Sequence, residues 1–321
     1  MKKLIAITLS IFAFALTGGI LSSLHPGANV LSYRNDGTRI IVTVPSGGGG
    51  FLPSTNTWIQ GLGCPVVIDF GSVGILSDGI HIVGGTNHCL FNGATWTYLA
   101  APPNVVNFAG GAVLSNVWYV SYRIGSGAAT NFISWTGGGS TWTVKPSPGN
   151  IYHSAWTTYR GKIWRMGSIN ALGDGTGTNC ASYDGTTWTT EAKLPAVVYN
   201  SSAGVYNDKI YIVGNYGDGF EGATNVYIYN GSSWSEGAGL PIKSSWGLTV
   251  TNNQGQLLHV VSQEQGSYRT NTLSFDGTNW TQIVGLNVAR NKLDQQGCNW
   301  GGTVYAISGG VTNMEYILPS N

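Results

Sequence analysis

Charged side chains are scarce in this chain of 321 residues. Lys and Arg together number 15, Asp and Glu number 14, and the formal net charge is +1. A dedicated nucleic-acid binder needs a basic surface that neutralises phosphates, so this balance excludes that class of protein. The scarcity of charge does not predict disorder, because 42% of the residues are hydrophobic and 12% are aromatic.

Residues that favour helices and runs that could cross a membrane are also scarce. The chain contains 48 glycines, and Gly, Thr, Ser and Asn, which form turns well and helices poorly, fill much of the sequence. The apolar run from Leu4 to Phe12 is shorter than the roughly 20 residues that a membrane-spanning helix needs. The composition therefore predicts an all-β protein with many turns and no membrane span.

The first fifteen residues allow two interpretations. Met1-Lys2-Lys3 is a short basic head, an apolar run follows, and Ala13-Phe14-Ala15 fits a processing site, so residues 1–15 resemble a bacterial secretory signal peptide. The same apolar run can also form a buried β-strand, because periodicity does not separate the two for a short segment. Residues 1–15 are predicted to be either a signal peptide or a retained N-terminal closing strand.

Cysteine is rare, with four residues and no C-x-x-C spacing. The spacing gives no support to a zinc or thioredoxin-type site, and we expect no metal and no cofactor. An even number of cysteines in an exported chain permits disulfides. Cys64 and Cys89 fall within one repeat of the sequence, and this pair is the one predicted for a possible disulfide.

A phrase of the form aromatic–Asp/Asn–Gly–x–x–Trp recurs along the chain. The tryptophans that end its full or looser copies are Trp96, Trp142, Trp188, Trp234 and Trp280. From Trp96 to Trp280, successive tryptophans are 46 residues apart. Trp58 ends another looser copy of the phrase, and Trp96 follows it by 38 residues. A fixed spacing is the signature of a repeat architecture, and the five recurring tryptophans are predicted to be structural.

Each repeat contains four strand patterns. In one unit they cover residues 202–206, 209–213, 225–229 and 232–235. Asn230-Gly231 is predicted to be a two-residue type I′ hairpin turn, because Asn-Gly readily takes positive φ. Four short antiparallel strands in about 40–50 residues form a propeller blade, and a blade buries its faces only against neighbours in a closed ring.

The repeats resemble those of kelch-type β-propellers over about residues 28–318. Gly84-Gly85 and Gly309-Gly310 match the glycine doublet that follows the second strand of a kelch blade, and an aromatic residue and a Trp follow as in that family. Gly214-Asn215 is half of the doublet and the other blades lack it, while four units of the chain have a shorter spacing between the aromatic residue and the Trp than kelch blades do. The resemblance implies the propeller architecture without a particular subfamily.

The number of blades depends on which segment completes the last one. Seven units start near Asn29, Gly71, Gly110, Ser154, Ser202, Gly247 and Gly297, and the last ends before a fourth strand. If residues 5–15 complete it, there are seven blades in one domain over residues 16–321, which we favour. If residues 55–60 do so, there are six blades over 51–321, preceded by an N-terminal anchor and a Gly linker over 16–50.

The loops predict which face of the ring recognises a ligand. The turns between strands 1 and 2 and between strands 3 and 4 are short and uniform, whereas the 2–3 loops and the 4–1 connections are long and variable. Variable loops on a rigid scaffold carry recognition. The wider set of residues on this variable face includes Phe108, Arg123 and His153. The predicted ligand-binding residues are Tyr199, Trp246, Arg290, Asp218, Glu264 and Arg269.

Aromatic rings beside amides and charges suit a sugar or another polar polymer. No H-E-x-x-H, G-x-S-x-G or P-loop pattern occurs, and no catalytic residue is assigned. The sequence favours a non-enzymatic binding propeller that is secreted, at the cell surface or in the periplasm, and that recognises a glycan or a protein. The alternatives are a structural or host-attachment protein of a phage or virion, as part of a larger assembly, and a carbohydrate-active enzyme.

Overall fold

The computed structural model describes residues 32–35, 40–43, 58–68, 70–124, 130–147, 149, 153–168, 176–215, 222–252, 254–264, 267–290, 293, 297–307, 312 and 314–317. The chain divides into two compact units, Met1–Ser54 and Thr55–Asn321. The segment 1–15 and the predicted ligand residue Asp218 lie outside the described residues. Among the described residues, no helix has the length and apolar character needed to cross a membrane.

The first unit contains one described hairpin. Strands β1 (Ser32–Asn35) and β2 (Ile40–Thr43) are antiparallel and pair with each other, with Ser32 opposite Thr43. They form a two-stranded sheet of their own. The strand–turn–strand pattern that starts near Asn29 is therefore a hairpin, but it does not build a four-stranded blade.

The second unit is a propeller of six four-stranded antiparallel blades, as far as its residues are described. Blade 1 is β4 (Ser72–Leu76), β5 (Gly79–Gly84), β6 (Asn87–Phe91) and β7 (Trp96–Tyr98). Blade 2 is β8 (Asn107–Leu114), β9 (Val117–Arg123), β10 (Thr130–Thr136) and β11 (Thr143–Lys145). Blade 3 is β12 (Ala155–Tyr159), β13 (Lys162–Met166), β14 (Cys180–Tyr183) and β15 (Trp188–Glu191), with the short 3-10 helix η1 (Thr176–Thr178) before β14.

Blades 4 to 6 complete the unit. Blade 4 is β16 (Ser202–Tyr206), β17 (Lys209–Val213), β18 (Val226–Tyr229) and β19 (Trp234–Glu236). Blade 5 is β20 (Leu248–Thr251), β21 (Leu257–Val260), β24 (Thr272–Phe275) and β25 (Trp280–Ile283), with the hairpin of β22 (Gln263–Glu264) and β23 (Ser267–Tyr268) between β21 and β24. Blade 6 is β26 (Gly297–Trp300), β27 (Thr303–Ile307), β28 (Met314–Ile317) and β3 (Ile59–Gln60).

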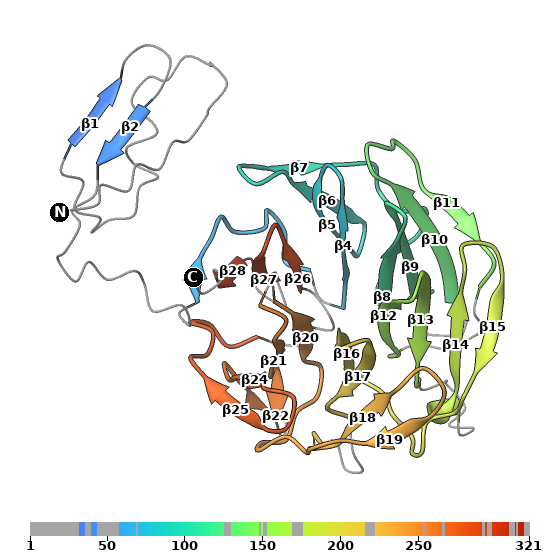
Figure 1. Ribbon diagram of the computed structural model, residues 1–321. Coiled ribbons are helices and arrows are strands. Elements are labelled where there is room, and N and C mark those ends of the chain that lie inside the picture. The colour runs from blue at the N-terminus through green and yellow to red at the C-terminus, as the bar shows by residue number, and fades with distance from the viewer. Residues whose placement is uncertain are drawn as a thin grey trace. The chain divides into compact units, whose positions relative to one another are not determined.

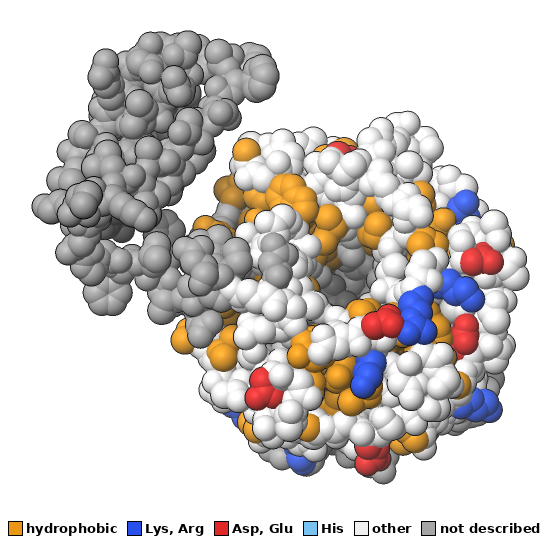
Figure 2. Space-filling model, in the orientation of Figure 1, with side chains coloured by type: hydrophobic (Ala, Val, Ile, Leu, Met, Phe, Trp, Pro, Cys, Tyr) orange, Lys and Arg blue, Asp and Glu red, His pale blue; other side chains and the backbone are white. Residues whose placement is uncertain are grey.

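The blades form a closed ring with their first strands innermost (Figure 1). Strands β4, β8, β12, β16, β20 and β26 are neighbours in this order, and β26 returns to β4. Figure 2 shows the ring hollowed at its centre, with hydrophobic side chains around the hollow and charged side chains of both signs beside it at the lower right. The all-β propeller predicted from the repeats is confirmed.

The ring is closed by a strand from the N-terminal side of the unit. Strand β3 pairs antiparallel with β28, and Gln60 lies opposite Glu315. The backbone then continues the contact, because the N–H groups of Gly61 and Cys64 donate to the carbonyls of Met314 and Thr312, at 2.8 and 2.6 Å. This is the six-bladed alternative of the sequence analysis, and the favoured count of seven is not confirmed.

Each interface between successive blades has its own buried apolar cluster. Side chains alternate along a strand, so each blade serves two interfaces. In β5, Ile80 and Ile82 pack with residues of blade 6, whereas Val83 packs with residues of blade 2. The period-2 pattern of the strands therefore builds the core between blades.

The recurring tryptophans join each blade to the one before it. The indole Nε1–H of Trp188 donates to the Pro146 carbonyl at 3.0 Å, and its ring packs on Tyr183 with centroids 4.9 Å apart. The other four Nε1–H groups donate to the carbonyls of Leu62, Ala100, Ala192 and Ala238. Trp280 is 8% exposed, and the other four are half-buried. This geometry is the one that a structural role requires.

The hairpin between strands 3 and 4 differs from its predicted form. Tyr229 pairs with Trp234, which leaves a four-residue loop, and within it Gly231 has φ +101° while Asn230 has no positive φ. The Asn230 side chain accepts hydrogen bonds from the N–H groups of Ser232 and Ser233, at 2.9 and 3.0 Å. The prediction of a two-residue type I′ turn is wrong, because the side chain caps the loop amides and makes a longer loop stable.

Candidate functional site

One end of the ring carries all the 2–3 loops and 4–1 connections, because the strands of every blade alternate in direction. We call this end the loop face. Tyr199 and Trp246 lie in 4–1 connections, and so does Arg290, between β25 and β26. Glu264 and Arg269 lie in the 2–3 loop of blade 5. Five of the predicted ligand residues therefore belong to the loop face by their place in the chain.

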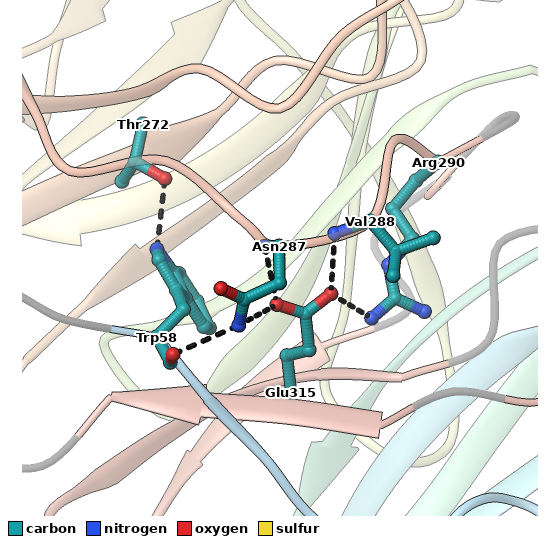
Figure 3. Close-up of polar contacts among 6 residues, drawn as sticks. All are labelled: Trp58, Thr272, Asn287, Val288, Arg290 and Glu315. Carbon is teal, nitrogen blue, oxygen red and sulfur yellow. Dashed lines mark hydrogen bonds and ion pairs between the residues drawn. The ribbon is translucent and has the colours of Figure 1, made fainter.

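Arg290 is held inside the protein and does not offer its guanidinium to a ligand. Its side chain is 0% exposed and pairs with the equally buried Glu315 at 2.9 Å (Figure 3). The other oxygen of that carboxylate accepts from the backbone N–H and the side-chain amide of Asn287, at 2.6 and 2.9 Å. The Asn287 amide also donates to the Trp58 carbonyl. These contacts secure the closing segment, so we assign Arg290 a structural role.

Two other predicted residues form an ion pair on the blade 5 loop. The Arg269 Nε lies 2.9 Å from the Glu264 Oε2, and their side chains are 41% and 22% exposed. Tyr199 is positioned through its backbone, since its N–H donates to the Asn215 side chain, whose amide donates in turn to the Val197 carbonyl. These groups offer polar contacts at the loop face.

A recurring backbone feature marks the start of five blades. The residue two positions before the regular first-strand ladder has a left-handed φ between 49° and 62° in each of them. These residues are Phe70, Phe108, His153, Asn200 and Trp246. Backbone hydrogen bonds at these positions join neighbouring blades. The Phe70 carbonyl accepts from the Ala109 N–H at 2.9 Å. The His153 carbonyl accepts from the Asn200 N–H at 3.0 Å, and the Asn200 carbonyl accepts from the Trp246 N–H at 2.8 Å.

Four of these side chains meet as one group, which we call the aromatic cluster: Phe70, Phe108, His153 and Trp246. Ring centroids are 4.2 Å apart for Phe70–Phe108, 4.7 Å for Phe108–His153, 4.8 Å for His153–Trp246 and 5.5 Å for Phe70–Trp246. They come from blades 1, 2, 3 and 5. Side chains of blades that are not neighbours can touch only inside the ring of first strands, so the cluster lies on the axis at the loop face.

The residues of the aromatic cluster have a backbone conformation that is unfavourable in free energy for their residue types. A left-handed conformation costs a residue with a Cβ about 1–2 kcal/mol, and only Gly, Asn and Asp adopt it readily. Asn200 follows this preference, whereas Phe70, Phe108, His153 and Trp246 do not. Strained residues of this kind gather at functional sites. The backbone conformation would favour Gly, Asn or Asp at these positions, so the presence of aromatic residues there is explained by a role of their side chains.

The aromatic cluster combines apolar rings with one nearby cation. The Phe70, Phe108 and His153 side chains are partly exposed, and Trp246 is 7% exposed. The Arg123 guanidinium lies 5.6 Å from the Phe108 ring centroid. The sequence analysis placed four of these five residues on the variable face but missed Phe70, which could have been found by comparing the position two residues before each first strand.

The remaining described histidines belong to buried networks inside the blades. His81 Nδ1 lies 3.0 Å from His88 Nε2, and His81 Nε2 lies 2.9 Å from Asp78. His259 lies 2.7 Å from the Ser244 hydroxyl, but both side chains are fully buried, so the pair is not an accessible nucleophile. Among the described residues, no three His, Cys, Asp or Glu are grouped to hold a metal ion.

Acid is expected to weaken the fold through these histidines. Burial lowers the pKa of His88 and of His259 to about 3. Below the ordinary value of about 6.5, the unfolded chain takes up protons that the folded protein does not. The free energy of unfolding should fall by about 1 kcal/mol per histidine from pH 6.5 to pH 5.5. Urea unfolding at the two pH values measures this, and His88→Gln should reduce the difference; an equal difference in both proteins would contradict the assignment.

No protein-family model matches the sequence, and no curated protein matches it either. Solved structures do match. The structure of YjhT is 15% identical with a TM-score of 0.68, and the match covers 81% of this chain and 97% of that chain. A fungal alcohol oxidase of the AA5 family, in complex with copper, is 14% identical with a TM-score of 0.53 over 78% of this chain and 62% of that chain. At these identities the similarity shows the β-propeller fold alone.

Proposed function

We propose that this protein is a non-enzymatic binding propeller whose loop face recognises a glycan at the aromatic cluster. The observation that supports this most directly is the meeting of four rings on the ring axis, each held in a left-handed backbone. A scaffold residue could be Gly or Asn at these positions at lower cost. Aromatic rings at strained positions are explained by a ligand that stacks on them.

The chemistry around the cluster favours a sugar over a strongly charged ligand. The flat face of a ring covers the C–H face of a sugar, and nearby polar groups take its hydroxyls. Arg123 lies beside Phe108, and the Glu264–Arg269 pair on the same face balances its own charge. With 9% of its residues charged, the chain offers little to an ionic partner.

We also propose that the protein acts outside the cytoplasm, secreted or at a cell surface. The support is the basic head, apolar run and processing site of residues 1–15. Sequencing the N-terminus of the purified protein is expected to give Leu16 as the first residue. A chain that retains Met1 within a virus particle would instead support the attachment role.

The binding proposal is tested on a panel of immobilised oligosaccharides, followed by titration of the strongest hit. Phe70→Ala, Phe108→Ala and Arg123→Ala are each expected to weaken binding about 5- to 150-fold, because loss of one central contact costs about 1–3 kcal/mol. Tyr98→Ala is the matched control: Tyr98 is 57% exposed but lies in β7, the outermost strand of blade 1. It should bind as the parent protein does.

Phe108→Gly separates a binding role from a packing role. Glycine relieves the left-handed backbone and removes the ring, so the free energy of unfolding should change by less than about 1 kcal/mol while binding is lost. If the variant instead unfolds readily and binds each sugar normally when folded, Phe108 serves packing. Binding that no cluster variant weakens, or a panel without a hit and a protein ligand found instead, would overturn the glycan proposal.

A further inference from the structure

Two cysteines lie together beside the strand that closes the ring. Cys64 follows the closing strand β3 by four residues, and its N–H donates to the Thr312 carbonyl of blade 6. Cys89 lies in β6 of blade 1, opposite Ile82. Both belong to the apolar cluster between the first and last blades, which also contains Met314. The pair therefore links the segment that follows β3 to blade 1, next to the β3–β28 pairing that closes the ring.

All four cysteines are buried free thiols in this structure, and Cys180 and Cys298 serve as internal comparisons for the pair. The Cys64 and Cys89 side chains are hydrogen-bonded to each other and are 2% and 0% exposed. Cys298 belongs to the same apolar cluster, and its pKa is raised by burial alone. Cys180 lies in a different cluster, between blades 3 and 4, with its thiol near the Thr178 carbonyl.

We propose that Cys64 and Cys89 form a disulfide between the segment after β3 and blade 1 when the chain folds in an oxidising compartment. This proposal stands independently of the glycan proposal, because the bond lies in the core and not at the loop face. Oxidising compartments are where such bonds form and persist. Detection of the bond in protein isolated from its host would therefore also support the proposal that the protein is exported.

The bond forms by thiol–disulfide exchange with a small disulfide such as oxidised glutathione. The thiolate of one of the two cysteines attacks one sulfur of glutathione disulfide and releases one glutathione thiolate, which leaves a mixed disulfide. The thiol of the other cysteine then loses its proton and attacks the protein sulfur of the mixed disulfide, which releases the second glutathione. Two protein thiols are oxidised and one glutathione disulfide is reduced to two thiols. Since both side chains are buried in the folded protein, exchange takes place before the segment after β3 packs against blade 1.

The disulfide would hold the closing strand near its place. Strand β3 contributes two residue pairs to blade 6, Glu315–Gln60 and Tyr316–Ile59. A bond from Cys64 to β6 fixes the segment after β3 against blade 1, so β3 stays within a few residues of its place even when its pairing with β28 opens. The constraint acts on the open and unfolded states, which is where a disulfide contributes its stability.

The test counts alkylated cysteines in the full-length protein. The chain is refolded from urea with oxidised glutathione, denatured and alkylated, with and without prior reduction, and examined by mass spectrometry. We expect two alkylated cysteines without reduction, four after reduction, and a linked peptide pair containing Cys64 and Cys89. Four alkylated cysteines without reduction, or a linked pair containing Cys180 or Cys298, would overturn the proposal.

Thermal unfolding gives a second, independent measurement. The Tm of the oxidised protein should exceed that of the reduced protein by about 5 °C. The double variant Cys64→Ala/Cys89→Ala should lose this difference, and the matched double variant Cys180→Ala/Cys298→Ala should keep it. Equal Tm values for the oxidised and reduced parent protein would contradict a bond that holds the closing strand in place.

Discussion

Replacing Glu315 by glutamine is expected to lower the free energy of unfolding by about 3–5 kcal/mol. The variant keeps the shape of the side chain but leaves the Arg290 guanidinium buried without its counter-charge. It also weakens the contacts that the carboxylate accepts from Asn287 and from the Val288 N–H. Because these groups join β28 to the connection before blade 6, the loss falls on the ring closure. Urea unfolding followed by tryptophan fluorescence measures it.

The surface pair of Arg160 and Asp208 is the matched control. Its side chains are 52% and 65% exposed, and it joins neighbouring turns on the end of the ring opposite the loop face. Asp208→Asn should lower the free energy of unfolding far less than Glu315→Gln does, because an exposed ion pair is screened by water and salt. Equal losses for Glu315→Gln and Asp208→Asn would mean that burial of the first pair does not decide its contribution.

The repeats made most of the fold predictable. The 46-residue spacing and the Asx–Gly hairpins predict blades, because the strands and turns that form a blade lie within one repeat. The blade count depends instead on a long-range pairing. Residues 30–42 have the strand–turn–strand pattern of a blade and do form the β1–β2 hairpin. The outer strand of blade 6 is the two-residue segment β3, which follows Trp58, the end of a looser copy of the phrase, and its partner β28 lies at the other end of the unit's sequence.

The site was less predictable, for a related reason. Arg290 looks like a polar loop residue until the fold brings Glu315 of β28 against it. The aromatic cluster depends on ring closure, since Phe70 and Trp246 meet from blades far apart in the sequence. Its backbone conformation is also hidden, because Phe and Trp seldom signal a left-handed φ. The sequence could assign loop residues to one face of the ring. Their burial and their contacts with one another depend on the closed ring and could not be predicted from the sequence.

Replacing Trp280 by alanine is expected to lower the free energy of unfolding by about 3–5 kcal/mol. Trp280 is the most buried of the five recurring tryptophans, and its ring packs on Phe275 with centroids 4.9 Å apart. Alanine would leave a cavity between blades 4 and 5, where Trp280 belongs to the apolar cluster with Leu240 and Tyr211. Trp188 is half-buried, so Trp188→Ala should cost less, about 2 kcal/mol.

Trp280→Phe separates the ring from its hydrogen bond. Phenylalanine keeps most of the packing on Phe275 but removes the Nε1–H that donates to the Ala238 carbonyl at 3.1 Å. The loss should be about 1–2 kcal/mol, because the partly buried carbonyl is left without that donor. Sugar binding by folded Trp280→Phe should match the parent protein, since the same tryptophan recurs in other blades, whereas a ligand site occurs once. A variant with unchanged unfolding but no sugar binding would mean that the recurring tryptophans belong to the binding site.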